Sequence, residues 1–382
     1  MTMEQVFTNA HVVTPTDVIA GGTLTVQADR IAAIETGISV RPNAIDLEGD
    51  YLLPGLVELH TDNLERHMSP RPGVSWPTIG AILAHDAQMA AAGITTVLDA
   101  LRLGDMFDGC AELEAVARPL EAIVQAEASG ATRAAHFLHL RCEIGCEETL
   151  GLFHALVDSP TLRLVSVMDH TPGQRQFTDP EKLRFYYTKK YGMTDGEFDR
   201  YTAQRMEAHA MHAARHRAEI VGLTRARRRA LASHDDATEA HVAEAVRDGM
   251  TVAEFPTTLA AARASHGNGL AVMVGGPNLV LGGSHSGNIA ARELACAGCV
   301  DIVSSDYVPN SLLQAAFKLH GAPIGMDMAK AVRTVSLNPA RAVGLQDRGA
   351  LEPEQRADLV RVRMVEGEPV VRAVWRDGKR VV

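Results

Sequence analysis

Aromatic side chains are scarce in this chain, and it has no long apolar run and no basic terminal arm. Only 4% of its 382 residues are Phe, Trp or Tyr, so Ala, Val, Leu and Ile must fill the core. No apolar stretch is long enough to cross a membrane, and the N-terminus lacks the pattern of a signal peptide. The formal charge of −10 argues against nucleic-acid binding. We therefore expect a cytoplasmic protein that has neither a membrane nor a nucleic acid as its partner.

The cysteines are few and odd in number, five in all, which argues against a disulfide framework. Cys296 and Cys299 form a C-x-x-C pair, but no second pair completes a zinc site. We interpret both as small buried apolar residues.

The two ends of the chain resemble each other in pattern. Short segments with alternating apolar and polar residues, separated by glycine turns, occupy residues 5–50 and again residues 357–382. This pattern predicts β-strands. We expect residues 1–53 and 346–382 to form one small β-sandwich domain, with residues 54–345 between them as a separate domain.

The middle of the chain has a different sequence pattern, in which eight apolar runs alternate with amphipathic helical segments. The runs are LVELH, ITTVLDAL, AAHFLHLRCEI, LRLVSVMDH, ALASHDD, TVAEFPTT, LAVMVGGPN and VDIVSSDY. Continuous apolar strands that alternate with helices indicate a buried parallel sheet. Eight such units predict a closed (β/α)8 barrel of the α/β class. A doubly wound open sheet is the alternative, but the glycine-rich first turn typical of that fold is missing.

Polar side chains with metal-binding chemistry follow five of these runs. In a barrel the carboxyl ends of all strands meet at one face, where active sites lie. His60 and Asp62 are two residues apart on the first run, so their side chains point the same way. The other run ends carry Glu143, Asp169, His170, His234, Asp235, Asp236 and Asp306. Mixed histidine and carboxylate ligands suit zinc, and also manganese or iron, so we predict a divalent metal site.

Several motifs resemble the amidohydrolase superfamily: LPGLVELHTD, SHDD, SSD and the segment Ser336–Leu345. Many members carry His-x-His on the first strand, where this chain has His-x-Asp. Many also bridge two metals with a carboxylated lysine, for which Glu143 is the only obvious strand-end substitute here. The resemblance therefore leaves open whether one or two ions bind.

Longer strings resemble one branch of that superfamily over nearly the whole chain. They include ELHTDNLERHMSPRP, MDHTPGQRQF, SHDDATEAHVAE and GGPNLVLGGSHSGN. Members of this branch act in phosphonate degradation by the carbon–phosphorus lyase pathway. The resemblance implies a metal-dependent hydrolase that cleaves α-D-ribose 1-methylphosphonate 5-triphosphate to the 5-phosphate and pyrophosphate. Superfamily barrels often form dimers, so the resemblance is also compatible with a homodimer.

On this resemblance we expect a divalent cofactor, with zinc as the first choice. The expected ligands are His60, Asp62, Glu143, His170, His234 and Asp306. A divalent ion lowers the pKa of water from 15.7 to about 7 and polarises a phosphoryl oxygen. Asp306 is expected to take the proton from the attacking water, because a carboxylate at a strand end has the reach and the basicity for it.

The expected substrate is anionic although the chain is acidic, so the local field must favour phosphate. The loop Gly275–Asn288 is rich in glycine and would let backbone N–H groups approach phosphate oxygens. A basic stretch precedes it in the chain. The expected substrate-binding residues are Gln174, Arg175, Arg184, Lys189, Lys190, Asn278 and His285.

Two other interpretations of the sequence stay open. The same metal site could activate water against carbon, as in a cyclic amide hydrolase or a deaminase. The basic stretch and the glycine loop favour a phosphate substrate instead. A non-catalytic barrel that serves as a binding subunit is the second alternative, and the full ligand set together with Asp306 argues against it.

Overall fold

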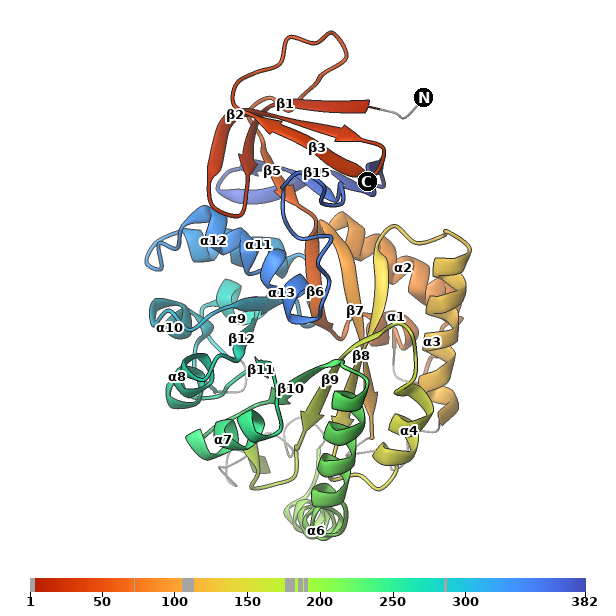
Figure 1. Cartoon of the computed structure of the whole chain (residues 1–382). Coiled ribbons are helices and arrows are strands. Elements are labelled where there is room, and N and C mark those ends of the chain that lie inside the picture. Colours follow the sequence, from red (N-terminus) through yellow and green to blue (C-terminus); the bar gives the residue numbers. More distant parts are fainter. Residues whose placement is uncertain are drawn as a thin grey trace.

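Two β-sheets organise the molecule, one from the middle of the chain and one from its two ends (Figure 1). The computed structural model describes residues 4–71, 73–104, 113–175, 183–184, 188, 192–284 and 287–382. Both termini lie at the end sheet, which sits above one end of the barrel in Figure 1.

The middle sheet has eight strands in sequence order, and every neighbouring pair is parallel. They are β6 (Leu56–Thr61), β7 (Ile94–Leu103), β8 (Ala135–Glu143), β9 (Leu162–Met168), β10 (Ala230–His234), β11 (Val252–Glu254), β12 (Ala271–Gly275) and β13 (Ile302–Ser304). Each matches one of the eight apolar runs, which confirms the predicted (β/α)8 barrel. The runs are continuous because these strands are buried on both faces.

The barrel is nearly closed between its first and last strands. Thr61 and Asp306 form a parallel bridge, and the N–H of Asp62 donates to the carbonyl of Asp306 over 3.0 Å. The buried carboxylate of Glu58 accepts from the N–H groups of His60, at 2.7 Å, and Ser305, at 2.6 Å. The Glu58 side chain thus accepts backbone hydrogen bonds that the short strand β13 leaves unmade between the first and last strands.

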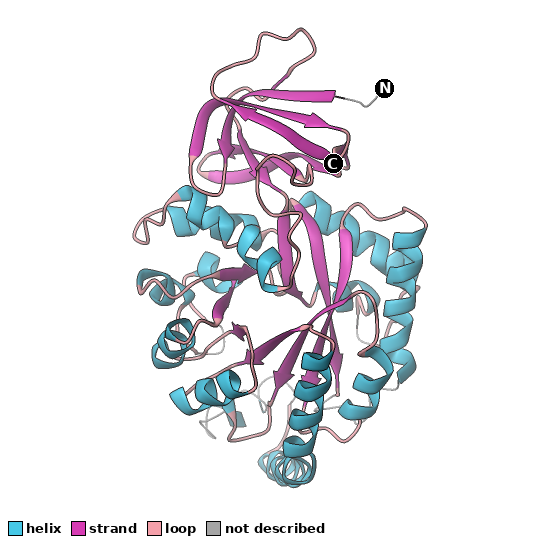
Figure 2. Cartoon of the chain, in the orientation of Figure 1, coloured by secondary structure: helices cyan, strands magenta, loops and turns pink. Residues whose placement is uncertain are grey.

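Helices cover the outside of the barrel, as Figure 2 shows by colour. They are α1 (Asn63–Met68), α2 (Thr78–Ala91), α3 (Leu113–Ala128), α4 (Thr149–Leu156), α6 (Asp195–Ala226), α7 (Glu239–Arg247), α8 (Leu259–Gly267), α9 (Gly276–Leu281), α10 (Ala291–Cys296), α11 (Ser311–His320), α12 (Met328–Arg333) and α13 (Leu337–Ala342). Threonine side chains cap the starts of α6, α7 and α8. None of the helices in the described part of the chain has the length and apolar character that a bilayer crossing requires.

The chain ends form one mixed sheet, which confirms the β domain built from both of them. Its strands are β1 (Glu4–Val13), β2 (Val18–Gln27), β3 (Arg30–Glu35), β4 (Ile45–Asp46), β5 (Tyr51–Pro54), β14 (Leu359–Val365), β15 (Glu368–Arg376) and β16 (Lys379–Arg380). β5 and β14 pair antiparallel and join the two ends. Side chains from both halves share one core, in which the rings of Phe7 and Trp375 lie 4.8 Å apart.

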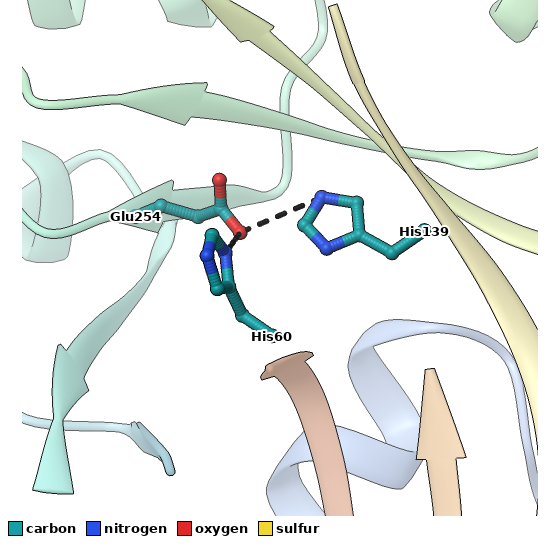
Figure 3. Close-up of side chains that lie close together, drawn as sticks. All are labelled: His60, His139 and Glu254. Atoms are coloured by element: carbon teal, nitrogen blue, oxygen red, sulfur yellow. Dashed lines mark hydrogen bonds and ion pairs between the residues drawn. The ribbon is translucent and has the colours of Figure 1, made fainter. Parts of the chain in front are cut away.

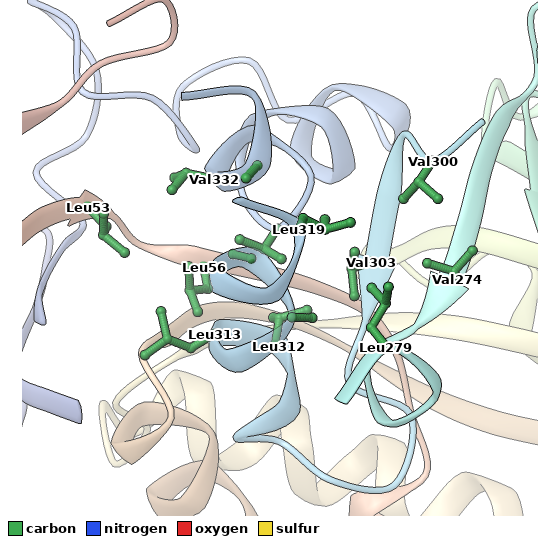
Figure 4. Packing of buried hydrophobic residues seen from close by; sticks show 14 of the residues in the cluster. Leu53, Leu56, Val274, Leu279, Val300, Val303, Leu312, Leu313, Leu319 and Val332 are labelled. Carbon is green, nitrogen blue, oxygen red and sulfur yellow. The ribbon is translucent and has the colours of Figure 1, made fainter. Parts of the chain in front are cut away.

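An apolar layer joins the barrel to the end sheet (Figure 4). Leu53 of β5 and Leu56 of β6 belong to it together with Leu312, Leu319 and Val332 of α11 and α12. The barrel strands β12 and β13 add Val274 and Val303. Because this core is continuous, the end sheet supports the strands that carry the site. We retain residues 1–53 with 346–382, and 54–345, as our proposed domain limits.

The junction between β5 and β6 yields a test of this packing. A Cβ atom on Gly55 would lie 2.1 Å from Oγ1 of Thr95 and 2.8 Å from Cβ of Asp358. Gly55→Ala should therefore lower the free energy of unfolding by at least about 1–3 kcal/mol, as overpacking does. Urea denaturation followed by circular dichroism measures this.

The matched control is Gly151→Ala in helix α4, where an added Cβ meets no atom within 4 Å. Alanine favours the helix by about 0.5–1 kcal/mol over glycine, so this variant should be as stable as the parent or more so. Equal stability of the two variants would contradict the tight junction.

Candidate metal centre

A cavity of about 240 Å³ opens at the carboxyl ends of the barrel strands. Its histidines, aspartates and arginine come from the ends of five strands and the residues that follow them: His60, Asp62, Arg141, His170, His234, Asp235 and Asp306. The strand ends that the sequence predicted to converge do so, and five of the six expected ligands line this one cavity.

Glu254, the last residue of β11, contacts three histidines, of which Figure 3 draws His60 and His139. One carboxylate oxygen lies 3.1 Å from Nδ1 of His60, and the other lies 2.9 Å from Nδ1 of His234. The Ser166 hydroxyl also donates to Glu254, over 2.6 Å. With each Nδ1–H donated to Glu254, each Nε2 keeps its lone pair, which is the arrangement found around metal-bound imidazoles.

Glu254 is ionised in this setting despite its complete burial. Burial alone would raise its pKa, but the neighbouring imidazoles of His139, His60 and His234 hold the pKa well below its ordinary value. The sequence analysis did not select Glu254. Its one signal in the sequence is a charged residue at the end of an otherwise apolar run, Thr251–Phe255.

Glu143 holds the third histidine in the same way. Its Oε2 lies 2.6 Å from Nδ1 of His170, and its Oε1 accepts the His170 N–H over 2.9 Å. The Nε2 of His170 faces Oδ2 of Asp235 at 3.5 Å. Burial alone would lower the pKa of His170, but the charges of Glu143 and Asp235 raise it to about 9. The surroundings of this imidazole therefore attract positive charge.

The cavity residues form two neighbouring groups with metal-binding donors. His60, Asp62 and Asp306 make one group, and His170, His234 and Asp235 make the other; within each group the donor atoms lie within 4.8 Å of one another. The rings of His60 and His234 are 6.0 Å apart, so the groups adjoin. Imidazole nitrogens mixed with carboxylate oxygens fit a divalent ion such as zinc, manganese or iron.

Three residues that follow barrel strands adopt the left-handed backbone conformation: Asp235, Phe255 and Asp306, with φ of 55°, 53° and 54°. Aspartate adopts it at small cost, whereas a bulky residue such as Phe255 is strained by about 1–3 kcal/mol. The Phe255 ring packs edge-on against His60, at 5.0 Å between centroids, and against His234, at 5.6 Å. The strained residue thus fills the space beside two imidazoles and restricts their rotation.

Asp62 is paired with an arginine that the sequence analysis passed over. Nη1 of Arg141, on β8, donates to Oδ1 of Asp62. Burial alone would raise the pKa of Asp62, but the charges of Arg141, His60 and Arg102 lower it to about 2. Asp62 is therefore ionised, as a metal ligand must be.

The expected substrate-binding residues lie in different places. Asn278 lines the cavity, and its amide group bonds to the backbone of Ile289 and Ala291. Gln174 lies in the segment after β9 and bonds through its backbone to Thr171. Lys189, Lys190 and His285 lie outside the described residues.

Two expected phosphate-binding arginines are engaged with carboxylates. Arg175 is buried and donates to Asp236 and Glu244. Arg184 pairs with Asp195 and Asp199 at the start of α6. Neither belongs to the cavity lining, because each guanidinium already fastens a loop to a neighbouring element.

Comparisons with known proteins agree with this geometry. A model of the amidohydrolase family matches residues 199–381. The alpha-D-ribose 1-methylphosphonate 5-triphosphate diphosphatase of Escherichia coli (strain K12) is 48% identical over 377 residues, or 98% of this chain and 100% of that protein.

Solved structures support the fold. N-acetylglucosamine-6-phosphate deacetylase from Pasteurella multocida has a TM-score of 0.64 at 13% identity, with 99% of each chain covered. N-isopropylammelide isopropylaminohydrolase from Burkholderia multivorans has a TM-score of 0.64 at 18% identity, covering 100% of this chain and 98% of that one. At such low identity these structures share an architecture with the chain, and their substrates carry no argument here.

A second buried polar cluster lies outside the barrel wall, between α2 and strands β7 and β8. Asp99 lies 2.7 Å from both His85 and His136, and His136 also contacts Asp86 at 3.3 Å. Arg133 pairs with Asp86, so the cluster balances its charges by itself. His85 in turn bonds to Asn63, the neighbour of Asp62. We interpret the cluster as a support for the loop that carries Asp62.

The cluster predicts a stability that depends on pH. Burial alone would lower the pKa of His136, but the charge of Asp99 and a hydrogen bond to Asp86 raise it to about 10. Replacing His136 removes the cation that two buried carboxylates share and leaves Asp86 with Arg133 alone, so His136→Gln should cost about 3–5 kcal/mol of unfolding free energy. The folded pKa of about 10 lies above the unfolded value of about 6.5. The cost should therefore be largest below about pH 6.5 and shrink as the pH rises toward 10.

Urea denaturation at pH 6 and pH 9.5 measures this cost. His266→Gln is the control, because His266 is 46% exposed and pairs with Asp301 at the surface; its effect should stay within about 0.5 kcal/mol. A cost for His136→Gln that is the same at both pH values would argue against a charged His136.

Proposed function

The chain belongs to the amidohydrolase superfamily, and from this we propose that it is a metal-dependent diphosphatase. Its substrate is α-D-ribose 1-methylphosphonate 5-triphosphate, and its products are α-D-ribose 1-methylphosphonate 5-phosphate and pyrophosphate. The observation that carries this proposal is the 48% identity that spans the whole length of the Escherichia coli diphosphatase. The cavity supports it with the donor set that such a hydrolysis requires.

We propose His60, Asp62 and Asp306 as one ligand group and His170, His234 and Asp235 as the other. Glu143 was expected as a ligand, and its contacts favour a role in orienting His170, as Glu254 orients His60 and His234. A bound divalent ion, zinc first and manganese or iron as alternatives, would supply Lewis acidity and lower the pKa of water. Room for two adjacent groups is compatible with one or two ions.

Asp306 is our proposed general base. It lines the cavity, and its donor atom lies within 4.8 Å of those of His60 and Asp62. Its backbone is fixed on both sides: the N–H donates to the carbonyl of His60 over 3.1 Å, and the carbonyl accepts from Asp62. The carboxylate is thus held where a water that attacks phosphorus would release its proton.

Substrate contacts come from the rim of the cavity in this proposal. Asn278 stands at the rim and fixes the segment that includes Ile289. Gly283 and Ser284 line the same side and belong to the glycine-rich loop. The exposed backbone of such a loop can donate hydrogen bonds to phosphate oxygens.

Phosphorus NMR tests the reaction directly. Purified protein supplied with a divalent metal should convert the ribose phosphonate triphosphate to free pyrophosphate and a 5-phosphate. A panel of cyclic amides and aminopurines, assayed alongside, should give no product. Release of orthophosphate alone, or turnover of a cyclic amide and not of the triphosphate, would sink the proposal.

Asp306→Asn in the same assay tests the base. Asparagine keeps the size of the side chain and tolerates the left-handed backbone at this position. Turnover should fall by about 10²–10⁴-fold, the usual contribution of a positioned acid or base. Metal content, measured by mass spectrometry, should stay close to that of the parent. A variant that works at the parent rate would remove Asp306 from this role.

Glu254→Gln tests the orienting carboxylate. Its amide can no longer accept from His60 and His234 with both oxygens, so the affinity for metal should fall about 10–100-fold. Competition with a chelator measures this affinity. Glu244→Gln is the control, because Glu244 also holds arginines but lies outside the cavity lining; its metal affinity should match that of the parent.

A further inference from the structure

Two arginines stand side by side at the carboxyl end of the barrel. Arg102 of β7 and Arg141 of β8 are register partners on neighbouring parallel strands. Residues paired in this way point to the same face of a sheet. Arg141 lines the cavity, so Arg102 extends from the same face at the next strand.

Arg141 has hydrogen-bond donors that the protein does not use. Its side chain is only 6% exposed and donates through Nη1 to Asp62. Its Nε is buried and has no hydrogen-bond partner. A buried guanidinium donor without a partner is costly, and because Arg141 lines the cavity, an anion bound there would accept from the donors of this guanidinium that Asp62 does not use. Among the described residues that line the cavity, no other is an arginine or a lysine.

Arg102 is exposed and forms no ion pair or hydrogen bond within the described part of the chain. Its register partner Arg141 donates to Asp62, so Arg102 stands one strand away from a residue of the site. The two other candidate arginines are engaged: Arg175 by Asp236 and Glu244, and Arg184 by Asp195 and Asp199. Of these four arginines, only Arg102 has no carboxylate partner in the described part of the chain, and it lies at the end of β7 beside Arg141.

We propose that Arg102 and Arg141 bind the two terminal phosphates of the substrate, the part that leaves as pyrophosphate. This proposal rests on the proposed diphosphatase function. Guanidinium groups bind phosphate oxygens in a bidentate manner. Arg141 lies beside Asp62 of the first ligand group, and Arg102 lies one strand farther along the rim. A chain of phosphates that begins at the metal ligands would run along these two residues.

Binding of inorganic pyrophosphate tests the site apart from turnover. Isothermal titration calorimetry on metal-loaded protein should show Arg102→Ala binding pyrophosphate about tenfold more weakly than the parent. The affinity should also fall less steeply with added salt, because one cation is missing. Arg141→Lys keeps the charge but loses the fork of donors, and it should weaken binding as well. Metal content is measured before and after, so that chelation by pyrophosphate is detected.

Arg372→Ala is the matched control. Arg372 is an exposed arginine on strand β15 of the end sheet, with no ion pair or hydrogen bond among the described residues. The same loss of charge there should leave pyrophosphate binding unchanged. If Arg102→Ala binds pyrophosphate as tightly as Arg372→Ala and the parent do, the proposal that Arg102 binds phosphate is wrong. This holds even if the protein hydrolyses the triphosphate. If the parent binds pyrophosphate through Arg102 but releases none from the triphosphate, the anion site stands and the diphosphatase function falls.

Discussion

The site depends on the contacts of one ionised carboxylate. It belongs to Glu254 of β11 and is buried inside the barrel, among side chains from β6, β9 and β10. Removing a carboxylate from water is expensive, and the cost is offset here by two imidazole N–H groups and the Ser166 hydroxyl. These contacts have a chemical consequence, because they fix the tautomers of His60 and His234. Both rings then present Nε2 to the cavity, and a metal ion needs that lone pair. The same hydrogen bonds thus stabilise the buried carboxylate and orient the imidazoles for metal binding.

Two other buried carboxylates also accept hydrogen bonds from N–H groups. Glu143 holds His170 by its Nδ1 and by its backbone N–H. Glu58 lies deeper, at the seam between β6 and β13, where it accepts from two backbone N–H groups. Burial raises the pKa of Glu58 to about 7, so its environment differs from that of Glu254, which is surrounded by imidazoles. The difference shows that burial alone does not set the charge of these groups; the charges of the neighbouring imidazoles also decide it.

The fold and the convergence of ligands could be predicted from the sequence, because both follow from periodicity and from the geometry of a parallel barrel. The roles of Glu254 and Arg141 could not. Glu254 ends a short apolar run, and nothing local in the sequence distinguishes it from Glu143, which was expected to be a ligand. Arg175 and Arg184 looked free because their partners are not neighbours in the sequence: Asp236 is 61 positions from Arg175, and Asp195 and Asp199 are 11 and 15 positions from Arg184. Charge pairing of this kind is decided by tertiary contacts, and the sequence alone gives only the composition of a segment.

Charges of opposite sign lie on different sides of the cavity. On the side of β9 and β10, carboxylates raise the pKa of His170 to about 9, so this region favours a cation, whether a proton or a divalent ion. On the side of β7 and β8, Arg102 and Arg141 lower the pKa of Asp62 to about 2, so that region favours an anion. A substrate with a single anionic methylphosphonate at one end and a more highly charged triphosphate at the other has one favourable orientation in such a field. The acidic net charge of the protein is therefore compatible with an anionic substrate, because the cavity separates its charges over a few neighbouring strands.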